Sequence, residues 1–202
     1  MVAIRPNVVI ITGTPGVGKS TVARLLAGEL GAELISLGEL VEREGLHEGR
    51  DPETGSLLVD LSRLAERLSE ILAATKPGQL FVVEGHYAQN VVPADRLLMA
   101  FVLRKNPYEL KCILVSRGYR GRKLYENLQA EILDVCLWET VQAYGMERVY
   151  EVDTTSRSPE EIVTEVLKAL KARKSRVGVV DWLGVLERDG RLSEFFNIEK
   201  QH

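Results

Sequence analysis

The sequence predicts an α/β protein in which helices cover both faces of a five-stranded parallel sheet. Short apolar runs rich in β-branched residues alternate with long amphipathic stretches, and this alternation is typical of that architecture. The runs are apolar almost throughout, as expected for strands that are buried on both faces. The expected strands occupy residues 7–12, 33–37, 80–83, 98–103 and 148–152.

The stretches between the strands carry the signals of helices, with apolar residues three and four positions apart. Gly31 is a typical C-terminal cap, and Ser158 followed by Pro159 is a typical helix start. The expected helices cover residues 19–30, a segment after Asp60, 107–118, 123–144 and a segment from Pro159. Residues 45–56 show no periodicity and are expected to form a long surface loop.

Length and composition favour one compact domain with a tail. The chain has 202 residues, 45% of them hydrophobic, and a formal net charge of −3. This charge argues against a protein that coats nucleic acid or membranes by global attraction. We expect a domain over residues 1–174 and a short helical tail over 175–202, in which the helix near 181–188 docks on the core through Trp182 and Leu186.

No apolar stretch approaches the roughly 20 residues that a membrane-spanning helix needs. Residues 1–7 run directly into the first expected strand, so the start of the chain does not read as a signal peptide. Cys112 and Cys136 lie far apart and show no metal-type spacing, and we expect both to be small core residues. Together these observations predict a cytosolic protein.

A glycine-rich motif follows the first expected strand and opens the first expected helix. Residues 13–20 fit the pattern Gly-x-x-x-x-Gly-Lys-Ser/Thr in the context that this pattern requires. Glycines let successive backbone N–H groups face one anion, and the lysine adds a point charge for the β- and γ-phosphates. The motif predicts a site for ATP with Mg²⁺, built from Gly13, Gly16, Val17, Gly18, Lys19, Ser20 and Thr21, with Ser20 as a magnesium ligand.

An acidic residue is expected beside this loop, at the carboxyl end of the third strand. Glu84 occupies that position and is a candidate for the magnesium side of the site, although a solvated strand-end glutamate is the alternative. His86 follows two residues later. It either contacts the reacting phosphate or a water molecule, or it is a structural histidine.

A cluster of cations lies between two expected helices. Residues 117–123 contain four arginines or lysines, from Arg117 to Lys123, and two glycines. Such a run is often only a solvated surface. Here the glycines provide a hinge and arginine binds phosphate in bidentate fashion, which favours a short mobile cationic flap.

These motifs resemble the nucleoside monophosphate kinase superfamily, and within it the adenylate kinase isoenzyme 6 family, also called the coilin-interacting nuclear ATPase family. The resemblance covers residues 5–172. The segments that carry it are residues 13–21, 37–40, 84–86, 102–104, 117–119 and 126–132.

The resemblance implies a three-layer P-loop kinase fold with a small monophosphate-binding segment at about 36–59 and a short lid at about 116–126. It implies that Arg43 holds the phosphate of AMP and that Arg117 is the lid arginine on ATP. The expected catalytic residues are then Lys19, His86 and Arg117. Adenylate kinases proper have a Pro-Arg pair after the acidic residue, whereas this chain continues with His86, Tyr87 and Ala88.

The implied activity is a broad-specificity adenylate kinase, converting ATP and AMP to two ADP, with ATPase activity. The resemblance further implies a role in maturation of the small ribosomal subunit, with a small-subunit ribosomal protein and pre-ribosomal RNA as partners. Two alternatives remain open at this point. One is an ATP-gated ribosome assembly factor with vestigial kinase activity, and the other is a P-loop kinase for a small metabolite.

Overall fold

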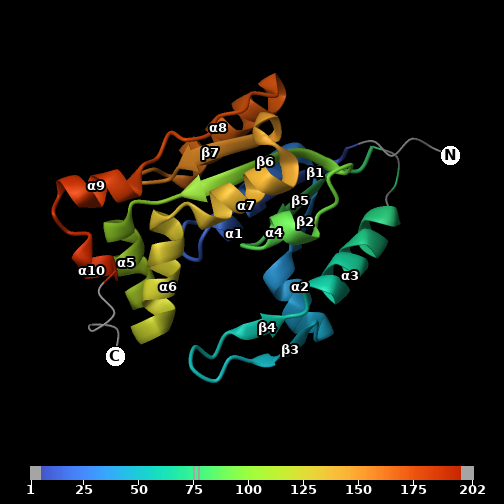
Figure 1. Cartoon of the computed structure of the whole chain (residues 1–202). Helices are drawn as coiled ribbons and strands as arrows, with labels where there is room; N and C mark the ends of the chain where they lie inside the picture. The colour runs from blue at the N-terminus through green and yellow to red at the C-terminus, as the bar shows by residue number, and fades with distance from the viewer. Residues whose placement is uncertain (1–5, 75, 77, 197–202) are drawn as a thin grey trace.

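The computed structural model describes residues 6–74, 76 and 78–196. Its centre is a parallel sheet of five strands in the order β2-β5-β1-β6-β7 (Figure 1). The sheet confirms the predicted α/β class, and each strand lies within one or two residues of its expected range. The strands are β1 (Val8–Thr12), β2 (Glu33–Ser36), β5 (Phe81–Glu84), β6 (Leu97–Arg104) and β7 (Val149–Asp153).

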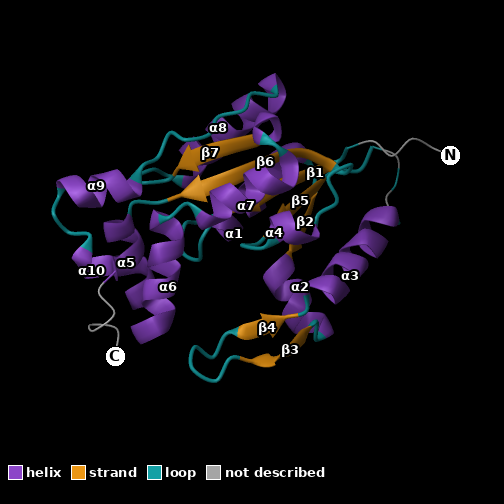
Figure 2. Ribbon diagram, in the orientation of Figure 1, coloured by secondary structure: helices purple, strands orange, loops and turns teal. Residues whose placement is uncertain are grey.

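Alternate residues of the central strand point to opposite faces of the sheet and build two cores. Val9 and Ile11 pack under α1 (Lys19–Leu30), α5 (Pro107–Ser116), α6 (Gly121–Ile132) and α8 (Pro159–Ala172). Val8 and Ile10 pack under α2 (Leu37–Glu44), α3 (Leu61–Ala73) and α4 (Ala88–Val91). Figure 2 shows the resulting helix–sheet–helix layers. Strands buried on both faces explain why the sequence runs are continuously apolar.

The helix expected over residues 123–144 is two helices. α6 ends at Ile132, and α7 (Val135–Tyr144) begins after a break at Asp134. Asp134 has φ 58°, in the left-handed region, and its carboxylate accepts a hydrogen bond from Arg104. The apolar spacing continues through the break, so the periodicity alone could not show that the helix ends there.

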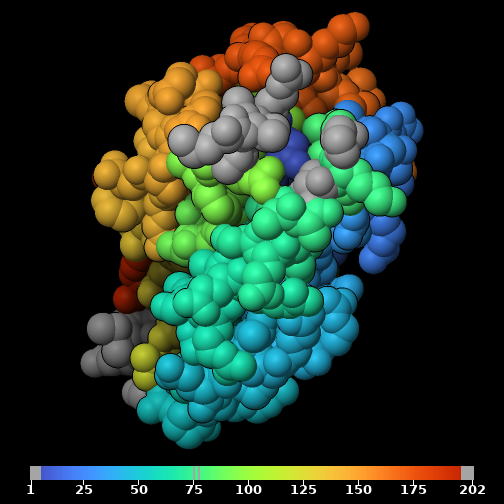
Figure 3. All heavy atoms as spheres, turned by 90° about the vertical axis from the view of Figure 1, so that its right-hand side faces the viewer, coloured from blue at the N-terminus to red at the C-terminus, as the bar shows by residue number. Residues whose placement is uncertain are grey.

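The segment expected to be a structureless loop at 45–56 is mostly a hairpin. β3 (His47–Arg50) pairs antiparallel with β4 (Leu57–Val59), and the eight-residue α2 precedes them. The tip is closed by Asp51, whose Oδ1 accepts from the backbone N–H of Thr54 at 2.6 Å. That hydrogen bond lowers the pKa of Asp51 below its usual value. In the space-filling view, α3 and the hairpin form the lower part of one face (Figure 3).

The C-terminal segment packs on the core as expected from its apolar residues. Arg176 forms an isolated parallel bridge with Tyr150 of β7, after which the chain crosses to α9 (Trp182–Arg188) and α10 (Ser193–Phe196). Trp182 is 7% exposed and Leu186 is fully buried, so the predicted docking residues are confirmed. The division into a domain over 1–174 and a tail over 175–202 stays a prediction, and residues 197–202 lie outside the described residues.

Two smaller expectations have different outcomes. Cys112 is exposed, on the outer side of α5, so its assignment to the core was wrong, whereas Cys136 is partly buried. Among the described residues, no helix is long and apolar enough to cross a membrane.

A buried arginine at the end of β6 joins three parts of the chain. Arg104 is 1% exposed, and its guanidinium donates to Glu131 Oε1 at 2.9 Å and to Glu151 Oε1 at 2.7 Å. Burial alone lowers the pKa of Arg104, but the facing carboxylates more than reverse this and leave the pKa raised. The charged guanidinium therefore ties α6, β7 and the end of β6 together.

Replacing Arg104 by methionine leaves two buried carboxylates without their counter-charge. We expect Arg104→Met to lower the free energy of unfolding by about 3–5 kcal/mol. The control is Arg122→Met, which removes the exposed ion pairs to Glu53 and Glu126 and is expected to cost about 0–1 kcal/mol for each pair. Urea denaturation measures both. Similar small losses in the two variants would contradict the structural role of the buried arginine.

Candidate active site

The phosphate loop at residues 13–18 connects β1 to α1 and needs glycine at two tight positions. Gly13 has φ 134°, and a Cβ there would lie 2.4 Å from the carbonyl oxygen of Leu103. Gly16 has φ 95°, and its Cβ would lie 2.8 Å from Leu110 Cδ1. Both the backbone conformation and the close approach to β6 and α5 therefore exclude larger residues. The loop keeps its shape because glycine alone fits there.

Lys19 lies at the first turn of α1, over the loop. Its Nζ donates to the carbonyl oxygen of Thr14 at 2.9 Å. Burial lowers the pKa of Lys19, and the negative charges of Glu84 and Glu131 act in the opposite direction. The described residues form no ion pair with this ammonium. An anion bound in the loop would therefore supply the negative counter-charge that the Lys19 ammonium lacks.

The buried side chains of Thr14 and Thr154 hold the loop in place through hydrogen bonds. Thr14 donates through Oγ1 to Glu131 Oε2 at 2.5 Å. Thr154, just after β7, donates through Oγ1 to the carbonyl oxygens of Val17, at 3.2 Å, and Arg104, at 2.8 Å. Sequence reasoning assigned no role to Glu131 or Thr154. A signal existed for Glu131, because a carboxylate three residues after Leu128 falls on the apolar face of its helix.

Glu84, at the end of β5, lies beside the start of α1. The residue is 6% exposed, and its Oε1 accepts from Ser36 Oγ at 2.7 Å and from Ser20 Oγ at 3.3 Å. Hydroxyl and carboxylate oxygens are the hard ligands that Mg²⁺ prefers, and Mg²⁺ bound with phosphates uses only one or two protein ligands. The residues present thus fit the magnesium ion that a bound triphosphate carries.

His86 lies in the turn that follows this acid. Its side chain is exposed, with its ring centroid 4.2 Å from that of Tyr87. Desolvation by surrounding protein and the positive charge of Lys19 lower the pKa of His86 to about 4. Gln89 holds the turn, because its Nε2 donates to the carbonyl oxygen of His86 at 3.0 Å. Near neutral pH the imidazole is uncharged.

The cationic segment is a short turn between α5 and α6. The side chain of Arg117 is exposed and makes no hydrogen bond or ion pair within the described part of the chain. Its charge is nevertheless close enough to lower the pKa of Lys19. By contrast, Arg122 pairs with Glu53 at 2.5 Å, and Lys123 Nζ donates to the carbonyl oxygen of Thr54 at 3.2 Å. These two contacts join the start of α6 to the tip of the hairpin.

The remaining expected ligands lie on helix surfaces. Thr21 is exposed in the first turn of α1. Arg43 is exposed near the end of α2, where it pairs with Glu44 at 3.3 Å. Glu44 is held more closely by Arg67, at 2.7 Å. Within the described residues no hydrogen bond or ion pair connects Arg43 with the phosphate loop, so its assignment to AMP stays a prediction.

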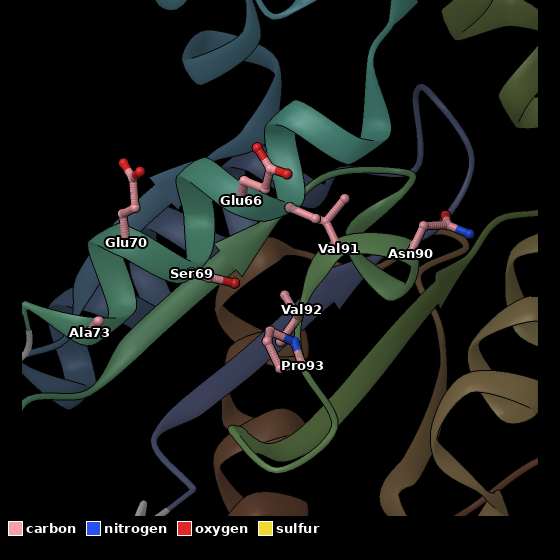
Figure 4. A pocket seen from close by; sticks show the side chains of 9 residues that line it. Glu66, Ser69, Glu70, Ala73, Asn90, Val91, Val92 and Pro93 are labelled. Atoms are coloured by element: carbon pink, nitrogen blue, oxygen red, sulfur yellow. The ribbon is translucent and has the colours of Figure 1, made fainter.

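A separate hollow of about 710 Å³ lies between α3 and residues 90–93 (Figure 4). Its walls include Glu66 and Glu70, and Glu70 pairs with Arg67 at 3.0 Å. No residue of the phosphate loop lines it, so the hollow is distinct from the candidate active site. Within the described residues no group of three or more histidine, cysteine or acidic side chains could hold a metal ion.

Cys136, at the start of α7, lies within electrostatic range of Lys19. Burial raises the pKa of this thiol to about 11, so the reactive thiolate forms only in strongly alkaline solution. We expect iodoacetamide at about pH 8 to label the exposed Cys112 and to leave Cys136 unmodified. Mass spectrometry of the digested protein identifies the labelled residue, with Cys112→Ser as the control. Rapid labelling of Cys136 would contradict its burial beside the loop.

Comparisons with known proteins agree with this geometry. Residues 9–134 match the family described as AAA domain. A protein of Methanothermobacter thermautotrophicus named "Putative adenylate kinase" is 44% identical over 181 residues, which cover 88% of this chain and 98% of the relative. A protein of Methanocaldococcus jannaschii with the same name is 41% identical, over 86% of this chain and 92% of the relative.

Solved structures show the same fold at low sequence identity. Shikimate kinase from Acinetobacter baumannii aligns with a TM-score of 0.60 at 17% identity, over 86% of this chain and 97% of that chain. A gluconokinase from Sinorhizobium meliloti aligns with a TM-score of 0.55 at 22% identity, over 83% and 93%. These similarities confirm the three-layer arrangement of a P-loop kinase.

Proposed function

The chain belongs to the AAA domain family, and from this premise we propose that it is a nucleoside monophosphate kinase that transfers the terminal phosphoryl group of ATP to AMP. The observation that carries the proposal is the phosphate loop with Lys19, which has no ion-pair partner among the described residues, next to the acid–hydroxyl pair of Glu84 and Ser20. The adenylate kinase names of the relatives support AMP as the acceptor.

In this reaction a phosphate oxygen of AMP attacks the γ-phosphorus of ATP. The bond from that phosphorus to the β–γ bridging oxygen breaks, and two ADP molecules leave. AMP is already an anion, so the step needs no strong base. Catalysis then consists of alignment and charge stabilisation in a site that excludes water.

Each residue of the site has its own role in this reaction. The loop amides and Lys19 bind the β- and γ-phosphates, and Thr21 contacts the α-phosphate. Ser20 and Glu84 would hold magnesium, which neutralises charge on the phosphates when it is bound. Arg117, exposed and without a partner among the described residues, turns onto the transferring group when the short lid closes. Arg43 binds the AMP phosphate.

Lys19→Ala should abolish phosphoryl transfer, because the transition state loses the charge nearest to its terminal oxygens. Loss of such a contact costs about 3 kcal/mol or more, or at least about a hundredfold in rate. A coupled assay of ADP formation from ATP and AMP measures the loss, and circular dichroism checks folding. More than about a tenth of the original rate in the folded variant would refute the loop assignment.

We further propose that the same site hydrolyses ATP, with His86 orienting the water. The support is that an uncharged imidazole nitrogen can accept a hydrogen bond from water, and that the chain reads His86, Tyr87 and Ala88 where adenylate kinases have a Pro-Arg pair. One contact to AMP is then missing, and the acceptor position is open to water.

His86→Ala should separate the two reactions. Hydrolysis depends on an oriented water, whereas AMP supplies its own nucleophile, so the variant should lose more ATPase than transfer activity, by about tenfold or more. Phosphate release from ATP alone and ADP formation with AMP are measured on the same preparation. Equal losses in the two assays count against this role of His86.

The wider role remains a proposal that rests on the family resemblance. We propose a cytosolic protein that acts in maturation of the small ribosomal subunit, binding a small-subunit ribosomal protein and pre-ribosomal RNA. ADP formation is compared with ATP alone, with each nucleoside monophosphate, and with the ribosomal protein. A rate that responds only to the ribosomal protein would favour the ATP-gated assembly factor over the kinase.

A further inference from the structure

The C-terminal segment reaches the phosphate loop through buried hydrogen bonds. Trp182, the first residue of α9, donates through its indole N–H to Glu131 Oε1 at 3.2 Å. The other oxygen of that carboxylate accepts from Thr14 at 2.5 Å. The carbonyl oxygen of Thr14 in turn accepts from Lys19 Nζ at 2.9 Å. A continuous series of contacts thus joins the indole to the loop lysine.

The carboxylate of Glu131 is shielded from water and depends on its protein donors. The residue is 1% exposed. Its Oε1 accepts from Trp182, from Arg104 Nε at 2.9 Å and from the backbone N–H of Lys105 at 3.0 Å. If the indole N–H is removed, Oε1 keeps two donors, Arg104 Nε and the backbone N–H of Lys105, and both lie at the end of β6. The carboxylate then has one fewer contact that fixes its position. Thr14, which donates to that carboxylate, is in turn held less firmly.

We propose that Trp182 is a positioning residue of the phosphate loop, which acts through Glu131 on Thr14 and so on the placement of Lys19. The inference rests on the proposed function only in taking ATP as the ligand of the loop. Trp182 lies outside residues 9–134, which match the AAA domain family. The C-terminal segment would therefore complete the nucleotide site, in addition to covering the core.

The first test measures nucleotide binding by calorimetry. Trp182→Phe keeps the ring packed on the core but removes the N–H donor, and we expect it to raise the Kd for Mg-ATP by about threefold to tenfold. Trp138→Phe is the matched control, because Trp138 is 63% exposed and its side chain makes no hydrogen bond within the described part of the chain. An unchanged Kd in the folded Trp182→Phe variant would overturn the proposal.

A double-mutant cycle separates positioning from a general loss of packing. If Trp182 acts through Thr14, then Trp182→Phe should change the Kd by less than about twofold in a Thr14→Val background. A merely structural tryptophan would have the same effect in both backgrounds, and that additive result would overturn the proposal.

Fluorescence gives a readout of Trp182 in a chain that keeps this residue. The chain has two tryptophans, so Trp138→Phe leaves Trp182 as the sole emitter. We expect saturating Mg-ADP to change the emission of Trp182, and to leave the emission of Trp138 in the Trp182→Phe chain unchanged. Binding in the calorimeter without a change in Trp182 emission would contradict the proposed coupling.

These measurements use no acceptor. A chain that binds Mg-ATP but transfers nothing to AMP refutes the proposed kinase activity and leaves the three tests of Trp182 intact. A chain that transfers phosphate normally in the Trp182→Phe form, with an unchanged Kd, refutes the role of Trp182 and leaves the kinase proposal standing.

Discussion

The interaction on which the rest of the structure depends is the buried pairing of Arg104 with Glu131 and Glu151. A fully buried charge is stable only when its partners are held in place, so this pairing fixes where α6 and β7 lie relative to the end of β6. The turn at Asp134, the contact to Thr14 and the insertion of Trp182 all involve the same group of side chains. The geometry of the phosphate loop therefore depends on a network that lies beneath it.

The sheet topology explains why the candidate site forms where it does. β1 lies between β5 and β6, so the loop after β1 is flanked by the carboxyl ends of both neighbours. β5 contributes Glu84, and β6 contributes the carbonyl oxygen of Leu103 that approaches Gly13. In parallel α/β sheets the ligand sites lie at this edge. Residues separated by 64 positions are in this way brought to one place.

Local signals were enough to predict the five strands and the phosphate loop. Each strand is a continuous apolar run, and residues 13–20 carry their conformational requirement in the glycines themselves. The break at Asp134 was not predictable, because the apolar spacing of α6 and α7 continues across it and the side chain that contacts Asp134 belongs to an arginine thirty residues earlier. The hairpin was missed because its strands lack a clear local pattern. β3 reads His-Glu-Gly-Arg, which lacks the apolar alternation of a strand, and among the described residues it pairs only with the three residues of β4.

The contact between the hairpin tip and α6 has a consequence for how easily the molecule opens. Arg122 and Glu53 are both more than 60% exposed, and ion pairs of this kind contribute about 0–1 kcal/mol. A free energy of that size corresponds to a population ratio of at most about fivefold, so this ion pair adds little to the hydrogen bond from Lys123 that also joins the two segments. Counterions weaken the attraction further. The ionic strength of the medium thus changes how firmly the hairpin tip is held against the start of α6.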